Sequence, residues 1–222
     1  MKTVAIITAA GEGKRMGRPK QFIKLCGQTI LERTVSVFEA CKNIAEIILV
    51  VNKEDLDQAK KIVAKKITNI VVGGAERQDS IRNALDVLSD DVRIVAIHDG
   101  VRPFITGSII KRAILEAKEF GAVVVGVPVV DTVKEVVESK VGLRTLDRSK
   151  LWAAQTPQVF RSEVILEAFS NLAKETKVTD DSMLVEKLGK PVKMVMGSYQ
   201  NIKITHPEDL VVAEMIIKGD KK

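Results

Sequence analysis

Short apolar runs alternate with helix-like patterns along the N-terminal part of the chain, and this alternation restricts the possible folds more than any other feature. Runs rich in Val and Ile are typical of strands buried on both faces, and apolar residues recurring every three or four positions are typical of covering helices. The pattern predicts strands at residues 4–8, 47–51, 70–72, 94–98 and 123–127, with helices at 30–41, 54–66, 80–88 and 109–120. Because each connection is long enough for a right-handed crossover, the sequence predicts a doubly wound α/β fold with a mostly parallel sheet.

The pattern changes between Val129 and Leu151, where apolar and polar residues alternate around a turn near Ser139, Lys140 and Gly142. This alternation predicts a β-hairpin with one polar face, too amphipathic for the centre of the sheet. Further elements are expected after it: helices at 162–173, 181–188 and 207–218, and short strands at 192–196 and 201–205. Because no repeat or linker interrupts the chain, we expect one domain, residues 1–222, with a protruding arm inserted at about 130–151 that packs on a second copy of the chain.

Composition and charge exclude several classes of function. With 45% apolar and 29% charged residues the chain is globular, and no apolar run approaches the ~20 residues that span a bilayer. Residues 1–10 resemble a signal peptide, but their apolar stretch is too short. The 4% aromatic content and the scattered basic residues argue against nucleic-acid binding, although the net charge of +6 suits anionic ligands. The two cysteines, Cys26 and Cys41, are too few to stabilise a chain of this size by disulfide bonds, so a cytoplasmic location is expected.

The strongest local motif follows the first predicted strand and reads AAGEGKRMG, residues 9–17, with Pro-Lys-Gln at 19–21. Open α/β sheets bind ligands at the carboxyl ends of their strands, and small residues there let backbone amides approach phosphate oxygens. Lys14, Arg15 and Lys20 add positive charge. The motif has Met16 where the dinucleotide fingerprint needs glycine at its sixth position, and it lacks the Ser or Thr of a Walker A loop. It predicts a phosphate-binding loop of neither common type; the alternative is a flexible turn with solvated charges.

Two more segments follow predicted strands at the same edge. The segment GGAERQDS, residues 73–80, could pass close to a flat ring of a ligand and place the Ser80 hydroxyl beside that ring. Alternatively, Gly73 and Gly74 form a turn and Ser80 caps the next helix. HDGVRP, residues 98–103, brings Asp99 to a position where a carboxylate could hold a divalent ion such as Mg²⁺ against a polyphosphate. Arg102 could neutralise a further phosphate. The alternative is that Asp99 is a turn residue and Arg102 a surface charge. His98 is expected to be buried and hydrogen-bonded, since two histidines cannot build a zinc cluster.

Taken in order, these three segments resemble the cytidylyltransferases that make 4-diphosphocytidyl-2-C-methyl-D-erythritol in the non-mevalonate isoprenoid route. Further matching segments lie at residues 130–134, 147–148, 155–158, 178–181 and 201–210, so the resemblance runs from about residue 3 to residue 217. It implies a Rossmann-like nucleotidyltransferase that uses CTP and Mg²⁺ and dimerises through its arm. It also implies direct in-line attack of the methylerythritol phosphate on CTP, with pyrophosphate leaving. The loop between Met16 and Pro19 is shorter than is usual in this family.

The resemblance also implies roles for individual residues. Arg15 and Lys20 would stabilise the transition state, while Arg148 and Lys203, also catalytic, would position the methylerythritol phosphate. Asp99 would serve the metal and the substrate. The nucleotide contacts would come from Ala9, Ala10, Gly11, Gly13, Gly74 and Ser80, and the substrate pocket from Arg102, Thr132 and Thr156. Since Thr132 and Arg148 belong to the arm, they are expected to act in the partner's site.

Other functions stay open at this point. A cytidylyltransferase for ribitol 5-phosphate would share the CTP loop and Asp99 and differ in the residues that read the polyol. A transferase of uridylyl or adenylyl sugars fits the GGAERQDS segment less well. A catalytically silent nucleotide-binding protein would keep the glycines but need not keep Arg15, Lys20 and Asp99 together. Nucleotidyl transfer itself needs positioning and charge neutralisation and no covalent nucleophile, which agrees with the residues available.

Overall fold

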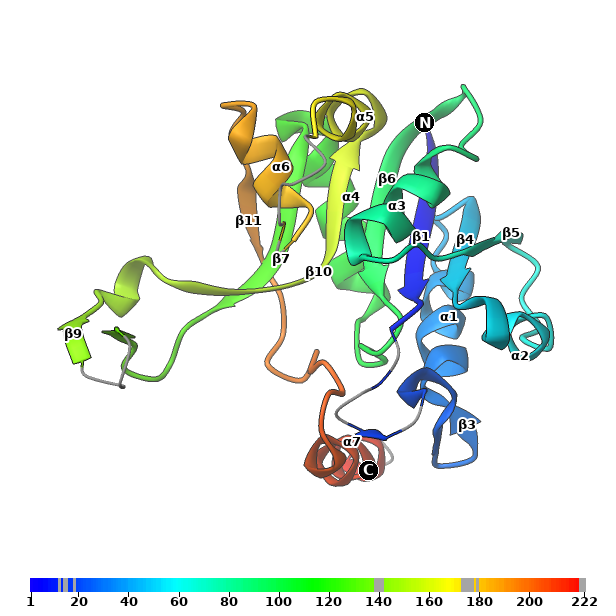
Figure 1. Ribbon diagram of the computed structural model, residues 1–222, viewed down its shortest axis with the longest axis horizontal. Coiled ribbons are helices and arrows are strands. Elements are labelled where there is room, and N and C mark those ends of the chain that lie inside the picture. Colours follow the sequence, from blue (N-terminus) through cyan, green and yellow to red (C-terminus); the bar gives the residue numbers. More distant parts are fainter. Residues whose placement is uncertain are drawn as a thin grey trace.

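A seven-stranded sheet forms the centre of the molecule. The computed structural model describes residues 1–11, 13, 16–17, 19–137, 142–172, 178 and 180–219. The strand order is β11-β7-β10-β6-β1-β4-β5, as seen in Figure 1. The strands are β1 (Lys2–Ala9), β4 (Glu46–Val51), β5 (Ile67–Val72), β6 (Val92–Asp99), β7 (Ala122–Pro128), β10 (Trp152–Arg161) and β11 (Lys193–Met196). All neighbours pair in parallel except β10, which is antiparallel to both β6 and β7, so the predicted fold class is confirmed.

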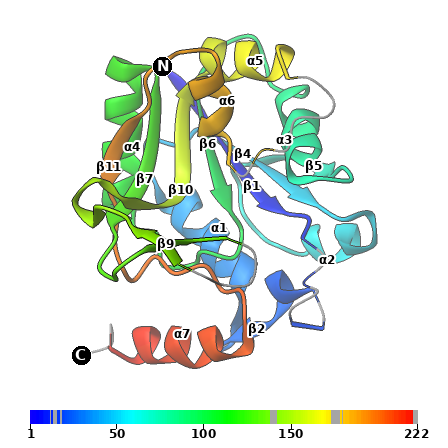
Figure 2. The same ribbon diagram turned by 60° about the vertical axis from the view of Figure 1, so that its left-hand side comes forward.

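Helices cover both faces of this sheet (Figures 1 and 2). The α-helices are α1 (Ile30–Ala40), α2 (Leu56–Ala59), α3 (Arg77–Leu85), α4 (Gly107–Phe120), α5 (Ser162–Ser170), α6 (Ser182–Lys187) and α7 (Pro207–Gly219). One apolar cluster contains residues of α1 and α4, and a second contains residues of α3, α5 and α6. Along β1, Ala5 and Ile7 belong to the first cluster and Val4 and Ile6 to the second. Successive strand side chains point to opposite faces, so a central strand is apolar throughout.

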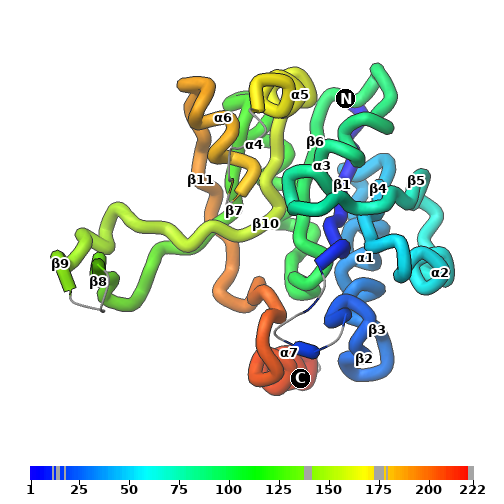
Figure 3. The backbone as a smooth tube through the Cα atoms, viewed as in Figure 1, coloured from blue at the N-terminus to red at the C-terminus, as the bar shows by residue number. Residues whose placement is uncertain are grey.

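The arm is an antiparallel pair, β8 (Lys134–Val136) and β9 (Gly142–Thr145), that lies apart from the main sheet. Figure 3 shows the chain leaving β7, forming this pair away from the body, and returning into β10. Every residue of the two strands is exposed. Of the predicted turn near Ser139, Lys140 and Gly142, the first two residues lie outside the described residues and Gly142 begins β9. A 3-10 helix, η5 (Arg148–Lys150), precedes β10.

Several expected elements differ in the structure. The helix expected at 54–66 is a 3-10 turn, η3 (Lys53–Asp55), followed by the four residues of α2. The strand expected at 201–205 has no regular secondary structure. Strand β10 was not predicted at all, nor was the small hairpin of β2 (Lys24–Leu25) and β3 (Gln28–Thr29). No helix in the described part of the chain is long and apolar enough to cross a membrane.

Two small elements close one end of the molecule. The 3-10 helix η2 (Lys20–Phe22) follows the predicted phosphate loop and leads into the β2–β3 hairpin. Helix α7 packs beside this hairpin in a third apolar cluster that includes Leu25, Ile30 and Ala213. Figure 2 shows α7 lying across the foot of the molecule near β2. This packing anchors the hairpin that follows η2 against α7.

Candidate active site

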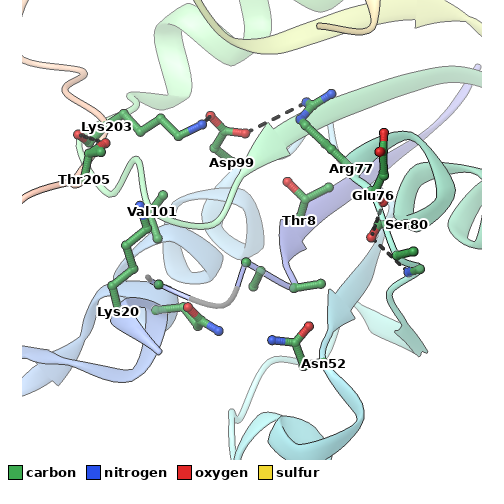
Figure 4. Close-up of a pocket in the computed structure, with 17 residues that line it drawn as sticks. Thr8, Lys20, Asn52, Glu76, Arg77, Ser80, Asp99, Val101, Lys203 and Thr205 are labelled. Atoms are coloured by element: carbon green, nitrogen blue, oxygen red, sulfur yellow. Dashed lines mark hydrogen bonds and ion pairs between the residues drawn. The ribbon is translucent and has the colours of Figure 1, made fainter. Parts of the chain in front are cut away.

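A cavity of about 580 Å³ opens at the carboxyl ends of the parallel strands. Figure 4 shows side chains from several strand ends pointing into it. Its described lining consists of Thr8, Ala9, Ala10, Gly11, Gly13, Lys20, Gln21, Asn52, Gly74, Ala75, Glu76, Arg77, Ser80, Asp99, Val101, Lys203 and Thr205. The cavity therefore contains nine of the candidate residues of the sequence analysis, contributed by segments far apart in the chain.

The predicted phosphate loop forms one wall of the cavity. Ala9 ends β1, and the chain then turns through Gly13, whose φ of 67° lies in the left-handed region that favours glycine. The Met16 amide donates to the Gly13 carbonyl at 2.7 Å. Lys20 enters the cavity from η2 (Figure 4). Arg15, the other predicted transition-state residue, lies outside the described residues, as does Lys14.

The second wall is the junction between β5 and α3, where the backbone approaches its neighbours closely. A Cβ atom on Gly73 would lie 2.5 Å from Ala10 Cβ, and one on Gly74 would lie 2.3 Å from Asp79 Cβ. The Ser80 hydroxyl accepts from the Gly74 amide at 3.1 Å and donates to the Glu76 carbonyl at 3.1 Å. Ser80 therefore holds the glycine segment against α3, and neither glycine position admits a side chain without movement.

Three positive charges surround Asp99, which ends β6 and is 7% exposed. Lys203 Nζ lies 3.0 Å from Asp99 Oδ2, Arg102 Nε 3.3 Å from the same oxygen, and Arg77 Nη2 3.9 Å from Oδ1. Burial alone would raise the pKa of Asp99, but the charges of Lys203, Arg77 and Arg102 outweigh it and hold that pKa well below its usual range. Asp99 is therefore ionised at neutral pH and faces the cavity (Figure 4).

Arg77 was not singled out by sequence reasoning, although it lies within the GGAERQDS segment. Its guanidinium donates to both carboxylate oxygens of the buried Asp181, at 2.6 and 2.8 Å. Burial would lower the pKa of Arg77, but the Asp181 carboxylate raises it further, so the guanidinium stays charged. Gln158 fixes Asp181 in turn, because its Oε1 accepts from the Asp181 amide at 2.9 Å. Pairing across 104 residues leaves no signal in a single sequence.

Thr156 and Arg102 lie behind the cavity wall rather than in its lining. Thr156 Oγ1 accepts from the Asp99 amide at 3.0 Å and lies 3.0 Å from His98 Nδ1. The other ring nitrogen of His98 is 3.2 Å from the Arg102 carbonyl, which can only accept. His98 Nε2 therefore donates and His98 Nδ1 accepts from the Thr156 hydroxyl. His98 is fully buried, as expected, and this network holds both ends of the segment around Asp99.

The two arm residues stand apart from the other candidates. Thr132 and Arg148 are exposed and do not line the cavity. Arg148 Nη1 donates to the Val130 carbonyl at 2.6 Å, a contact within the arm itself. The structure of one chain thus brings Lys20, Lys203 and Asp99 together and leaves Thr132 and Arg148 on the projecting hairpin.

Among the described residues, Asp99 offers a buried carboxylate that could hold a divalent cation at this site. No group of three or more Asp, Glu, His or Cys side chains that could hold a metal occurs in the described part of the chain. Mg²⁺ needs no such cage when phosphate oxygens and water complete its shell, and one or two carboxylates suffice. An ionised carboxylate at the edge of a cation-lined cavity is a donor set of this kind.

The described lining of the cavity contains neither cysteine nor histidine, so it offers no thiolate or imidazole for covalent catalysis. It offers small residues for close backbone approach, cations for phosphates and the carboxylates of Asp99 and Glu76, at the strand ends of an α/β sheet. These properties place the chain among the nucleotidyltransferases of the α/β class.

Comparison with known proteins identifies the family. Residues 3–219 match the family described as 2-C-methyl-D-erythritol 4-phosphate cytidylyltransferase. A protein of that name from Alkaliphilus oremlandii is 48% identical over 225 residues, covering 98% of this chain and 95% of the relative. One from Clostridioides difficile is 49% identical over 224 residues, covering 98% and 94%. The crystal structure of 4-diphosphocytidyl-2C-methyl-D-erythritol synthase from Anaerococcus prevotii superposes with a TM-score of 0.89 at 36% identity, covering 98% of this chain and 96% of that one. The chain belongs to the 2-C-methyl-D-erythritol 4-phosphate cytidylyltransferase family and is a nucleotidyltransferase.

Proposed function

We propose that this protein transfers the cytidylyl group of CTP to 2-C-methyl-D-erythritol 4-phosphate, giving 4-diphosphocytidyl-2-C-methyl-D-erythritol and pyrophosphate. The observation that carries the proposal is the cavity in which Lys20, Lys203 and Asp99 face the glycine-rich walls. The family to which the chain belongs supports the choice of both substrates.

In this reaction the phosphate of the polyol attacks the α-phosphorus of CTP in line, and pyrophosphate leaves. Ala9, Ala10, Gly11 and Gly13 bind the triphosphate through the backbone, and Gly74 with Ser80 forms the nucleoside wall. Lys20, together with Arg15, neutralises the charge that develops on the phosphorus as the bond forms. Lys203 and Arg102 orient the attacking phosphate, and Thr156 holds Asp99. Positioning and charge neutralisation supply the catalysis, so no side chain needs to act as a nucleophile.

We further propose that Asp99 holds a divalent cation, most simply Mg²⁺. Such an ion supplies positive charge to the triphosphate when it is bound. Asp99 is suited to this role because its neighbours keep it ionised. Residues 1–222 would form one catalytic domain with the arm inserted at about 130–151, and the enzyme would act in the cytoplasm, where its unpaired Cys26 and Cys41 stay reduced.

The arm supports a homodimer in this proposal. Leu143 is 63% exposed and Val136 55% exposed, on a pair of strands that has no apolar core of its own in the described residues. A two-stranded ribbon is at best marginally stable alone, so a partner surface would stabilise it. Thr132 and Arg148 would then reach the polyol phosphate in the partner's cavity.

Pyrophosphate release tests the proposed reaction. With CTP and Mg²⁺, we expect turnover of 2-C-methyl-D-erythritol 4-phosphate and little turnover of ribitol 5-phosphate. The Lys20→Ala variant should lower kcat by about 100-fold or more because a preorganised charge is lost from the transition state. Lys24→Ala is the matched control, since Lys24 is exposed four residues away. Preference for ribitol 5-phosphate would identify the sister enzyme, and binding of CTP without turnover of either polyol would identify a silent nucleotide-binding protein.

A further inference from the structure

A buried hydrogen bond joins the helix that carries Lys20 to η3, the short 3-10 helix that follows strand β4. Gln21 Nε2 donates to Asp55 Oδ2 at 3.1 Å, across 34 residues of sequence. Gln21 is 1% exposed and Asp55 is 6% exposed. Burying a carboxylate costs free energy unless it is hydrogen-bonded, so breaking the bond between Gln21 and Asp55 would be unfavourable. Asp55 lies outside the cavity that holds the reacting groups, and Gln21 lies in its lining.

The helix η2 needs an external anchor because it spans only Lys20 to Phe22. One turn of 3-10 helix has few internal hydrogen bonds: the Phe22 amide donates to the Pro19 carbonyl at 3.4 Å and the Ile23 amide to the Lys20 carbonyl at 3.1 Å. No side chain caps its N-terminus. The orientation of such a short helix is therefore set by the contacts that its side chains make with the rest of the molecule.

Gln21 supplies such a contact on a side of the helix different from that of Lys20. Adjacent side chains of a 3-10 helix are about 120° apart, because the helix has three residues per turn. A hydrogen bond that fixes the direction of Gln21 thus also fixes the direction in which the Lys20 side chain leaves the backbone. Figure 4 shows Lys20 reaching into the cavity from this helix.

Asp55 is itself fixed by the sheet. It ends η3, directly after β4, and its amide donates to the Asn52 carbonyl at 3.0 Å. The last residue of β4, Val51, is fully buried and pairs with both β1 and β5. The connection therefore runs from the rigid centre of the sheet through Asp55 and Gln21 to Lys20.

We propose that Asp55 is a positioning residue that sets the direction of Lys20 through Gln21. This inference rests on the proposed function, in which Lys20 neutralises charge in the transition state. A misplacement of a reacting group by about 1 Å can lower a rate by about 100-fold, so a residue outside the cavity can control turnover through this connection.

The test compares substitutions that keep or remove the acceptor oxygen. Asp55→Leu removes it at similar size, and we expect kcat to fall by about 10- to 100-fold with KM for CTP changed by less than about threefold. Asp55→Asn keeps an oxygen that can accept from Gln21, and should restore kcat to within about threefold of the wild type. Asp57→Leu is the matched control, because Asp57 lies two residues away and its side chain is 91% exposed. Thermal unfolding reports whether each variant is folded.

Two further measurements separate positioning from a general loss of structure. In a Lys20→Ala background, Asp55→Leu should have no additional effect on kcat, since its effect passes through Lys20. The rate at which acetic anhydride acetylates Lys20, followed by mass spectrometry of its peptide, should change in Asp55→Leu and not in Asp57→Leu. If Asp55→Leu does not fold, Gln21→Met removes the donor of the same bond without adding a charge beside Lys20, and should change the acetylation rate in the same way.

The outcomes are distinguishable. Normal kcat and normal Lys20 acetylation in Asp55→Leu would overturn the inference, as would an undiminished effect of Asp55→Leu in the Lys20→Ala background. If the wild type releases no pyrophosphate from CTP but Lys20 acetylation still depends on the Asp55 oxygen, the proposed function fails and the positioning role stands.

Discussion

His98 is a buried residue that orders the segment around Asp99 without lining the cavity. Its ring lies between the Thr156 hydroxyl and the Arg102 carbonyl, and also against the Phe38 ring, with a centroid distance of 4.8 Å. In the neutral ring, Nε2 donates to the Arg102 carbonyl and Nδ1 accepts from the Thr156 hydroxyl, so both hydrogen bonds are satisfied without a charge. Burial lowers the pKa of His98 to about 4 from its usual 6.5, with the nearby charges of smaller effect.

This histidine should make the stability of the protein depend on pH in a defined window. Between about pH 6.5 and pH 4 the unfolded chain binds a proton at His98 that the folded protein does not. The free energy of unfolding should therefore be highest above this window. As the pH is lowered through the window, it should decrease by up to about 1.4 kcal/mol per pH unit, about 3 kcal/mol in all. Urea unfolding at a series of pH values measures the slope. Asp99 contributes to the pH dependence of stability only at lower pH, because the ordinary pKa of its carboxyl group is 3.8 and the folded protein lowers it.

The two histidines provide a controlled comparison. His98→Gln should lower stability at neutral pH and lose the slope in this window, whereas His206→Gln, at an exposed position, should retain it. Parallel pH curves for the wild type and His98→Gln would contradict the assignment.

The site residues differ in how far a single sequence can predict them. Ala9, Gly74 and Asp99 lie at strand ends, and parallel strands bring their carboxyl ends to one edge, so position along the chain was enough. Arg77 and Asp55 act through partners that only the folded chain brings near. Their hydrogen bonds depend on tertiary packing, which has no local sequence pattern.

At the scale of elements, the junction between β5 and α3 depends on a glycine. Gly74→Ala would force the new Cβ against Asp79, and we expect a loss of about 1–3 kcal/mol in the free energy of unfolding, because α3 must shift. KM for CTP should rise as the nucleoside wall moves. Urea unfolding and steady-state kinetics measure the two effects.

Gly107→Ala serves as the control, because Gly107 begins α4 and a Cβ there has no atom within 4 Å. It should change stability by less than about 1 kcal/mol. Equal losses in the two variants would show that the cost comes from glycine's flexibility and not from the contact with Asp79.

The buried parallel strands of the central sheet were predicted correctly, whereas the amphipathic pattern at 54–66 did not give a helix over its whole length. β1 is apolar over residues 4–7 and β4 over residues 47–51, because both faces of the central sheet are covered there. The segment 54–66 has a helical pattern, yet α2 ends at Ala59 and Val63 is 98% exposed, since the chain must return to begin β5 at Ile67. β10 carries Gln155, Pro157 and Gln158, which are unusual in a central strand. Those glutamines are buried because they hold Asn201 and Asp181.

For the whole molecule, the arm determines whether one chain can complete a site. If Arg148 acts in the partner's cavity, an equal mixture of Arg148→Ala and Lys20→Ala subunits should recover about a quarter of wild-type activity. Half of the dimers are then mixed, and one of their two sites is intact. Pyrophosphate release before and after subunit exchange measures the recovery. An inactive mixture, with heterodimers verified by mass spectrometry, would show that Arg148 and Lys20 serve the same subunit's site.

The place of β10 in the sheet has a consequence for how the protein is made. β10 lies between β6 and β7, yet it is synthesised after both. As the chain leaves the ribosome, β1, β4, β5 and β6 can assemble first. Both edges of β7 stay unpaired until β10 and β11 have been synthesised. Nascent chains therefore expose unpaired apolar strand edges until residue 161 has emerged for β10 and residue 196 for β11, and these edges are the surfaces most prone to misassociation and most in need of chaperones.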